Sequence, residues 1–261
     1  MLYNIRGKYY QFEERSVHMG VLMNVQLTAF SNNRIEPTTA IIELLLKELN
    51  SLGGYVFLPS MITGQNIDIA AGTIKSVNNL SFLTIDQTVQ IACMNERIDV
   101  IFNGNKDNQD TTIEDFLVFA EKALASVMKQ NNVYSNRLAI NISLLSDVFE
   151  KELRDTKLGK KLCNTLDFYN DGEIEEWSTR TNSRRCINMS QNEVLNVITE
   201  LSVVKENVTN NKRFLCHMDI NTIQENAGYR FAFSDLNCFK HEVLEIIQNL
   251  KTNFEELGID D

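Results

Sequence analysis

The stretch from Thr88 to Met128 constrains the fold more than any other, because its hydrophobic period changes once along its length. Its first part, as far as Asn103, consists of two short apolar runs with polar residues between them, which is typical of two paired strands. From Thr111 onward, apolar residues recur every three or four positions, which is typical of an amphipathic helix. Thr111 and Glu114 have the spacing of a helix-capping pair. A similar strand-then-helix order returns between Phe214 and Leu257.

Two further strands are predicted from strict alternation of apolar and polar residues, because side chains one apart point to opposite faces of a sheet. The apolar positions are Met23, Val25, Leu27 and Ala29 in the first strand, and Leu138, Ile140, Ile142 and Leu144 in the second. A helical segment follows each strand, from Glu36 to Asn50 and from Val148 to Leu166. In both cases more strands and a final helix come next.

We therefore interpret the chain as two pseudo-repeated β-α-β-meander-α halves, residues 1–134 and 135–261, packed as one unit. Residues 1–20 are expected to form an arm or an edge strand. Helices packed on one face of an antiparallel sheet belong to the α+β class. The pattern leaves open whether the two halves share one sheet.

Several segments of the chain, taken in order, resemble a sporadically distributed, uncharacterised bacterial protein family of about this length. They are Leu80–Asp86, Val89–Ile91, Glu96–Asn103, Asn136–Asn141, Met218–Ile220 and Phe254–Glu256. Two features of the family differ here: Ile140-Asn141-Ile142 replaces its Arg-Tyr-Ile-Asn, and only Asp219 remains of a late acidic pair. The resemblance implies a fold and a bacterial, cytosolic setting, such as a defence, toxin–antitoxin or phage-related system. It implies no established chemistry.

Composition narrows the classes of function. The net charge of −10 over 261 residues disfavours a general nucleic-acid surface, which needs excess Lys and Arg. No apolar run approaches the roughly 18 residues of a membrane-spanning helix, and no signal peptide is recognised. The 5 cysteines are widely spaced, which favours reduced thiols in the cytoplasm. No glycine-rich phosphate loop or nucleophile elbow is present, so we predict no cofactor.

The polar segment that precedes the predicted long helix has the oxygen spacing of an EF-hand calcium loop. The matching positions are Asn103, Asn105, Asp107, Thr111 and Glu114. Against this, Asn108 stands where the EF-hand has glycine, and a strand precedes the loop instead of a helix. The alternative is a polar connection in which Asp110 or Thr111 caps the helix.

His217 and Asp219 lie on one face of a predicted strand, where a histidine beside a carboxylate can act as a general base or a metal ligand. A metal-dependent nuclease or phosphohydrolase is the enzyme hypothesis that this pair supports. The other histidines, His18 and His241, are not at ligand spacing. The alternative is an exposed polar pair on the open face of a sheet.

Three arginines, Arg180, Arg184 and Arg185, are clustered around a hairpin turn expected at Asn182-Ser183. Arginine can bind phosphate with two parallel hydrogen bonds, and the nearby Trp177 could stack on a base. The cluster is the one local feature that favours nucleic-acid binding. The alternative is a solvated turn or a protein contact.

Because no chemical motif is distinctive, we predict a cytosolic protein-binding or self-associating module whose partner is another protein or a second copy of itself. An edge strand predicted at Ile67–Ala70 would favour strand addition or dimerisation. The enzyme built on His217 and Asp219, and a nucleic-acid binder built on the three arginines, are the alternatives.

Overall fold

The computed structural model describes residues 21–68, 72–104, 111–146, 176–189, 192–205 and 211–256 of the chain. The predicted arm at residues 1–20 and the predicted helical segment Val148–Leu166 lie outside these residues. So do Asn105, Asp107, Asp110 and Cys163, and the end of the predicted edge strand, residues 69–70.

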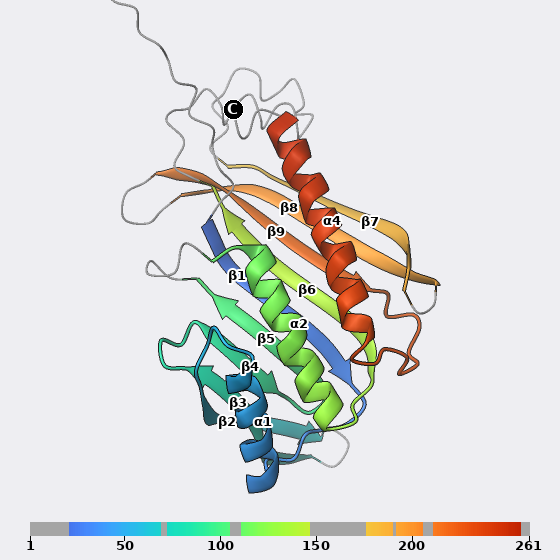
Figure 1. Ribbon diagram of the computed structural model, residues 1–261. Coiled ribbons are helices and arrows are strands. Elements are labelled where there is room, and N and C mark those ends of the chain that lie inside the picture. The colour runs from blue at the N-terminus through green and yellow to red at the C-terminus, as the bar shows by residue number, and fades with distance from the viewer. Residues whose placement is uncertain are drawn as a thin grey trace, which may run out of the picture.

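The nine described strands form one sheet in the order β2-β3-β4-β5-β1-β6-β9-β8-β7, and every neighbouring pair is antiparallel. They are β1 (Val21–Ser31), β2 (Phe57–Asp68), β3 (Thr73–Thr84), β4 (Val89–Cys93), β5 (Arg97–Asn103), β6 (Ser135–Leu145), β7 (Ser178–Asn188), β8 (Asn192–Lys205) and β9 (Lys212–Thr222). Strands from both parts of the chain therefore share one sheet, with β1 and β6 side by side at its centre (Figure 1).

The helices α1 (Thr39–Ser51), α2 (Ile113–Gln130) and α4 (Asp235–Glu256) lie on the same face of this sheet (Figure 1). This arrangement confirms the α+β class. Within the described ranges, no helix combines the length and the apolar character that crossing a membrane would require.

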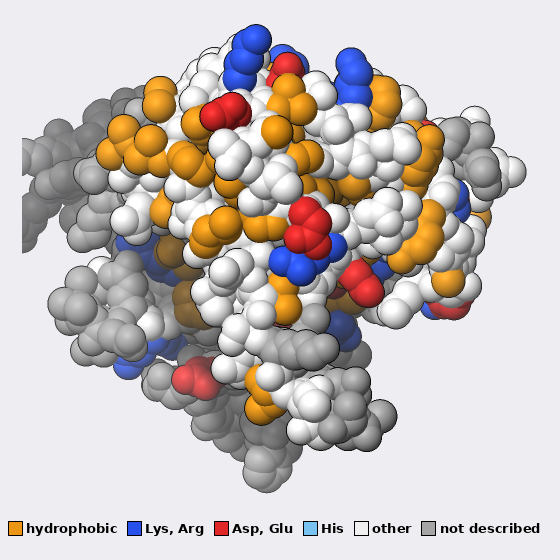
Figure 2. Space-filling view, turned by 90° about the horizontal axis from the view of Figure 1, so that it is seen from below, with side chains coloured by type: hydrophobic (Ala, Val, Ile, Leu, Met, Phe, Trp, Pro, Cys, Tyr) orange, Lys and Arg blue, Asp and Glu red, His pale blue; other side chains and the backbone are white. Residues whose placement is uncertain are grey.

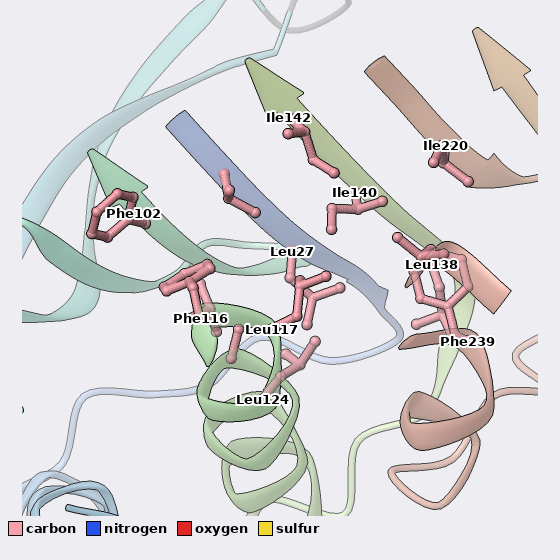
Figure 3. Packing of buried hydrophobic residues seen from close by; sticks show 14 of the residues in the cluster. Leu27, Phe102, Phe116, Leu117, Leu124, Leu138, Ile140, Ile142, Ile220 and Phe239 are labelled. Carbon is pink, nitrogen blue, oxygen red and sulfur yellow. The ribbon is translucent and has the colours of Figure 1, made fainter. Parts of the chain in front are cut away.

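The hydrophobic core lies between the helices and the sheet. Leu117 and Leu124 of α2 point toward Leu27 of β1, and Phe239 of α4 lies beside Leu138 of β6 (Figure 3). The predicted stripe of α2 is buried at every position: Phe116, Phe119, Ala120, Ala123, Leu124 and Val127. The alternation predicted for β6 is also confirmed, because its four apolar positions are buried.

Met23 departs from the alternation predicted for β1. Its side chain is 41% exposed, whereas Leu22 is buried. The β1–β6 pairing shifts by one residue between Leu22 and Asn24, so Met23 is the extra residue of a β-bulge. Because a bulge reverses the faces of the residues before it, the predicted pattern holds from Val25 onward and fails at Met23.

The N-cap of α2 is one residue later than predicted. Thr112, not Thr111, accepts a hydrogen bond from the backbone N–H of Asp115 at 3.0 Å. Its hydroxyl also lies 2.7 Å from Oδ2 of Asp115, so the capping pair is Thr112 with Asp115 instead of Thr111 with Glu114. Both spacings are three residues, and the sequence could not separate the two registers.

Candidate functional site

His217 and Asp219 share one face of β9, as predicted. This face is opposite the helices, whereas Phe214, Cys216 and Met218 are buried. Nδ1 of His217 is 3.1 Å from the hydroxyl of Ser143 on β6. Oδ1 of Asp219 accepts a hydrogen bond of 2.8 Å from the amide of Asn221. No three acidic, histidine or cysteine side chains among the described residues are grouped so that they could hold a metal ion. The hydrogen bonds of the pair are thus made with neutral groups, and Glu200 of β8 lies opposite His217.

The two described ends of the candidate calcium loop already have partners. Oδ1 of Asn103 accepts a hydrogen bond of 2.9 Å from the amide of Asn24 on β1. Glu114 lies in the first turn of α2, where its carboxylate is 3.2 Å from the ammonium of Lys251 on α4. These contacts tie the loop ends to β1 and α4, and calcium binding stays an untested hypothesis.

The hairpin predicted at Asn182-Ser183 is wrong, because these residues lie in the middle of β7. All eleven residues of β7 pair with β8, from Ser178 opposite Ser202 to Asn188 opposite Asn192. The segment resembled a turn because an edge strand that is exposed on both faces lacks the apolar alternation of a half-buried strand.

The three arginines do not form one surface. Arg180 and Arg184 are four residues apart and share a face of β7, but Arg185 points to the opposite face. The guanidinium of Arg184 is 2.7 Å from the carboxylate of Glu225. Trp177 is only 8% exposed, and its ring packs 5.8 Å from that of Phe214. It is therefore part of the core and cannot stack on a base in this conformation.

The edge strand on the other side of the sheet is β2, and it is longer than the Ile67–Ala70 segment suggested. Among the described strands, β2 pairs only with β3, in a twelve-residue register from Phe57 opposite Thr84 to Asp68 opposite Thr73. Pro59 lies within it, as expected of an edge strand, because proline cannot donate a ladder hydrogen bond. Pro59 could have identified this edge strand from the sequence, but the prediction placed the edge at Ile67–Ala70.

Large apolar side chains are exposed around β2. Leu58 and Met61 of β2 are 53% and 48% exposed, and Ile74 of β3 is 65% exposed. Val56 and Ile85, which flank the first β2–β3 pair, are exposed at 63% and 75%. Seen from below, the molecule carries hydrophobic side chains over much of its surface, with charged side chains only singly or in small groups (Figure 2). The β2 edge is thus the described region that combines open backbone with apolar side chains.

The chain was compared with known proteins: no protein-family model and no curated protein matches it.

Proposed function

We propose that this chain is a cytoplasmic protein-binding or self-associating module whose contact surface is the outer edge of β2. One observation carries the proposal: β2 has an unpaired edge among the described strands, and none of its residues before Asp68 is charged. An unpaired edge presents a row of backbone N–H and C=O groups to which another strand can pair. The exposed Leu58 and Met61 would add apolar contact on both faces of such a pairing.

The opposite edge of the sheet is protected against such pairing. The strand β7 carries Arg180, Arg184 and Arg185, all exposed. Charged side chains on an edge strand oppose edge-to-edge association, because like charges would be brought together. The contrast between a charged and an uncharged edge within one sheet supports β2 as the binding edge.

The partner that needs the fewest assumptions is a second copy of the chain. Two β2 strands can pair antiparallel about a twofold axis, which makes the contact self-complementary. Because Pro59 has no N–H to donate, the added pairing would involve the residues after it, from Ser60 to Asp68. No like charges would face each other over most of this segment.

The sheet order also supports the hypothesis of two related halves, residues 1–134 and 135–261. Reading outward from the β1–β6 centre, the next strand on each side is the last strand before a long helix: β5 before α2, and β9 before α4. The four described cysteines are free thiols, which fits a reducing compartment. The bacterial setting stays a prediction from the resemblance.

The experiment is sedimentation velocity over a range of protein concentrations, with lysine pairs placed on either edge. Ser60→Lys with Met61→Lys adds two charges to β2, and Thr181→Lys with Asn182→Lys adds the same charges to exposed positions of β7. We expect the wild type and the β7 variant to dimerise with increasing concentration. The β2 variant should stay a monomer because its edge strands repel each other.

A wild type that remains a monomer throughout would exclude the second copy as partner. Affinity capture from host cells with both variants would then test a different protein partner. A partner retained equally by the β2 and the β7 variants would contradict the proposed edge.

A further inference from the structure

Two adjoining hollows lie on the face of the sheet that the helices leave open, at the end where β1 finishes. The first has a volume of about 390 Å³ and the second about 290 Å³. Phe30 of β1 and Glu96 of the β4–β5 turn line both of them. The backbone N–H of Ser31 donates to the carbonyl of Glu96 at 2.8 Å, which fixes this turn against the end of β1.

The second hollow contains an arginine whose Nε has no hydrogen-bond acceptor. Arg137 of β6 is opposite Phe30, with its guanidinium carbon 5.0 Å from the centre of the Phe30 ring. Its Nε is buried and has no hydrogen-bond partner, and no described carboxylate forms an ion pair with it. By contrast Arg97, opposite Phe30 on the other side, donates its Nε to Asp99 at 2.7 Å. A partly buried cation without an anion is costly, so Arg137 is suited to an oxyanion.

The wall of the first hollow contains a buried acceptor without a donor. Asn79 of β3 is only 3% exposed, and its Oδ1 is buried without a hydrogen-bond partner. Buried polar atoms are nearly always paired, so such an orphan needs an explanation. Apolar groups of Phe30, Val77 and Met94 line the same hollow. This apolar part of the lining is suited to an aliphatic group of a ligand.

We propose that the two hollows together bind a small zwitterion of the amino-acid or short-peptide type. Its carboxylate would bind the guanidinium of Arg137, its protonated amine would bind Glu96, and an aliphatic side chain would pack against Val77 and Met94. The aromatic ring of Phe30 separates the two ends of the ligand.

The charges favour a zwitterion over a phosphate. Glu96 is exposed on the rim shared by both hollows, and the carboxylate of Asp99 is held near the first by Arg97. Asp99 compensates the charge of Arg97, which lines the first hollow, so Glu96 is the carboxylate left to repel a doubly negative phosphate. The net charge of −10 adds to that repulsion. A neutral zwitterion with its amine directed toward Glu96 avoids this cost.

The second hollow has a rigid wall. Arg230 donates from Nη1 to the carbonyls of Asn136 and Asn226, both of which belong to lining residues. Its other nitrogens, Nε and Nη2, contact both carboxylate oxygens of Glu193 at 2.6 and 2.9 Å. The cavity around Arg137 is therefore formed before any ligand binds. This favours binding because fewer side chains and loop residues have to be ordered when the ligand enters.

The experiment is isothermal titration calorimetry of the full chain with glycylglycine and leucylglycine. Two blocked probes, N-acetyl-leucylglycine and leucylglycinamide, lack one charge each, and inorganic phosphate serves as the competing anion. We expect leucylglycine to bind best, and each blocked probe to lose roughly tenfold or more in affinity because it leaves one charged group unpaired. Phosphate should not compete.

Variants assign the two ends of the ligand. Arg137→Gln should weaken leucylglycine binding about as much as amidation of the probe does. Glu96→Gln, at an exposed position with little effect on folding, should reduce the preference for the free amine over the acetylated one. Lys122→Gln, on the exposed side of α2, changes the net charge as Arg137→Gln does and should leave binding unchanged.

Absence of binding by both dipeptides would overturn the proposal, as would equal binding of the free and blocked probes or displacement by phosphate. The calorimetry measures binding of a small peptide and not association of chains. A negative result would therefore reject the peptide site without affecting the proposal that β2 is the binding edge.

Discussion

The hydroxyl of Thr28 donates a hydrogen bond to Oδ1 of Asp99, 2.7 Å away across the β1–β5 pairing. Both residues are at most 2% exposed, although they lie on the face without helices. Gln26 donates to the same oxygen at 2.9 Å, and Arg97 donates to Oδ2 at 2.7 Å. The carboxylate is thus a buried charge at the centre of the sheet that depends on three donors.

Thr28→Val should therefore destabilise the protein. It keeps the shape of the side chain but removes a donor to a buried charge, a loss of about 1.5–3 kcal/mol in the free energy of unfolding. Thr63→Val is the matched control, because the hydroxyl of Thr63 bonds Asn78 at an exposed position and its loss should cost less than about 0.5 kcal/mol. Urea unfolding measures both. Equal effects would mean that Asp99 does not need the Thr28 hydroxyl.

The ion pair of Arg230 and Glu193 gives a second prediction. Their side chains are 8% and 5% exposed. Arg230→Met leaves a buried carboxylate unpaired and should cost about 3–5 kcal/mol. The double variant Arg230→Met with Glu193→Leu should recover much of that loss, because the orphaned charge is gone. If the double variant is as unstable as the single one, the hydrogen bonds from Arg230 to Asn136 and Asn226 matter more than the charge.

The position of the α2 cap can be tested with two neighbouring threonines. Thr112→Ala should lower the free energy of unfolding by about 1 kcal/mol, because the N–H of Asp115 loses its acceptor. Thr111→Ala should change it by less than about 0.5 kcal/mol. Thermal unfolding of the two variants distinguishes the two possible caps. If Thr111 and Glu114 formed the cap instead, Thr111→Ala would be the more destabilising of the two.

The buried thiols predict a loss of stability at alkaline pH. Burial raises the pKa of Cys93 and of Cys216 from 9.0 to about 12. Between these values the unfolded chain loses the thiol protons while the folded chain retains them, so deprotonation favours unfolding. The contribution of these two thiols to the free energy of unfolding is complete below pH 9 and decreases as the pH rises toward 12.

Urea unfolding at a series of pH values measures this slope, and Cys93→Ala should make it shallower. Cys186→Ser is the control, because Cys186 is exposed and should leave the slope unchanged. A thiol reagent applied to the native protein at mildly alkaline pH should modify Cys186 and spare Cys93. An unchanged slope in Cys93→Ala would assign the alkaline loss to other groups.

The sequence predicted those elements whose two faces differ. The strand β6 and the helix α2 each have one buried side, so their apolar periods were visible in Leu138 to Leu144 and in Phe116 to Val127. It failed at β7, where both faces are exposed and the polar run around Asn182 resembled a turn. It also failed at Met23, because a bulge is a property of the pairing between two strands and not of either strand alone.

The hollows around Phe30 could not be predicted for a related reason. Phe30, Asn79 and Arg137 come from three different strands, and four successive pairings, β3–β4, β4–β5, β1–β5 and β1–β6, bring them to one end of the sheet. Whether a polar atom of Asn79 or Arg137 lacks a hydrogen-bond partner depends on the tertiary arrangement around it. The spacing of residues along the chain does not contain that information. His217 and Asp219 were found from the sequence because they are two residues apart on a single strand.

The central position of β1 has a consequence for synthesis on the ribosome. The strand is made early, and β5 can pair with one of its sides as soon as the first meander is complete. Its other side must wait for β6, since Val21 pairs with Leu145. A partly made chain therefore exposes a long strand edge that the finished protein covers completely, and nascent chains that stall before β6 should be the species most prone to aggregate.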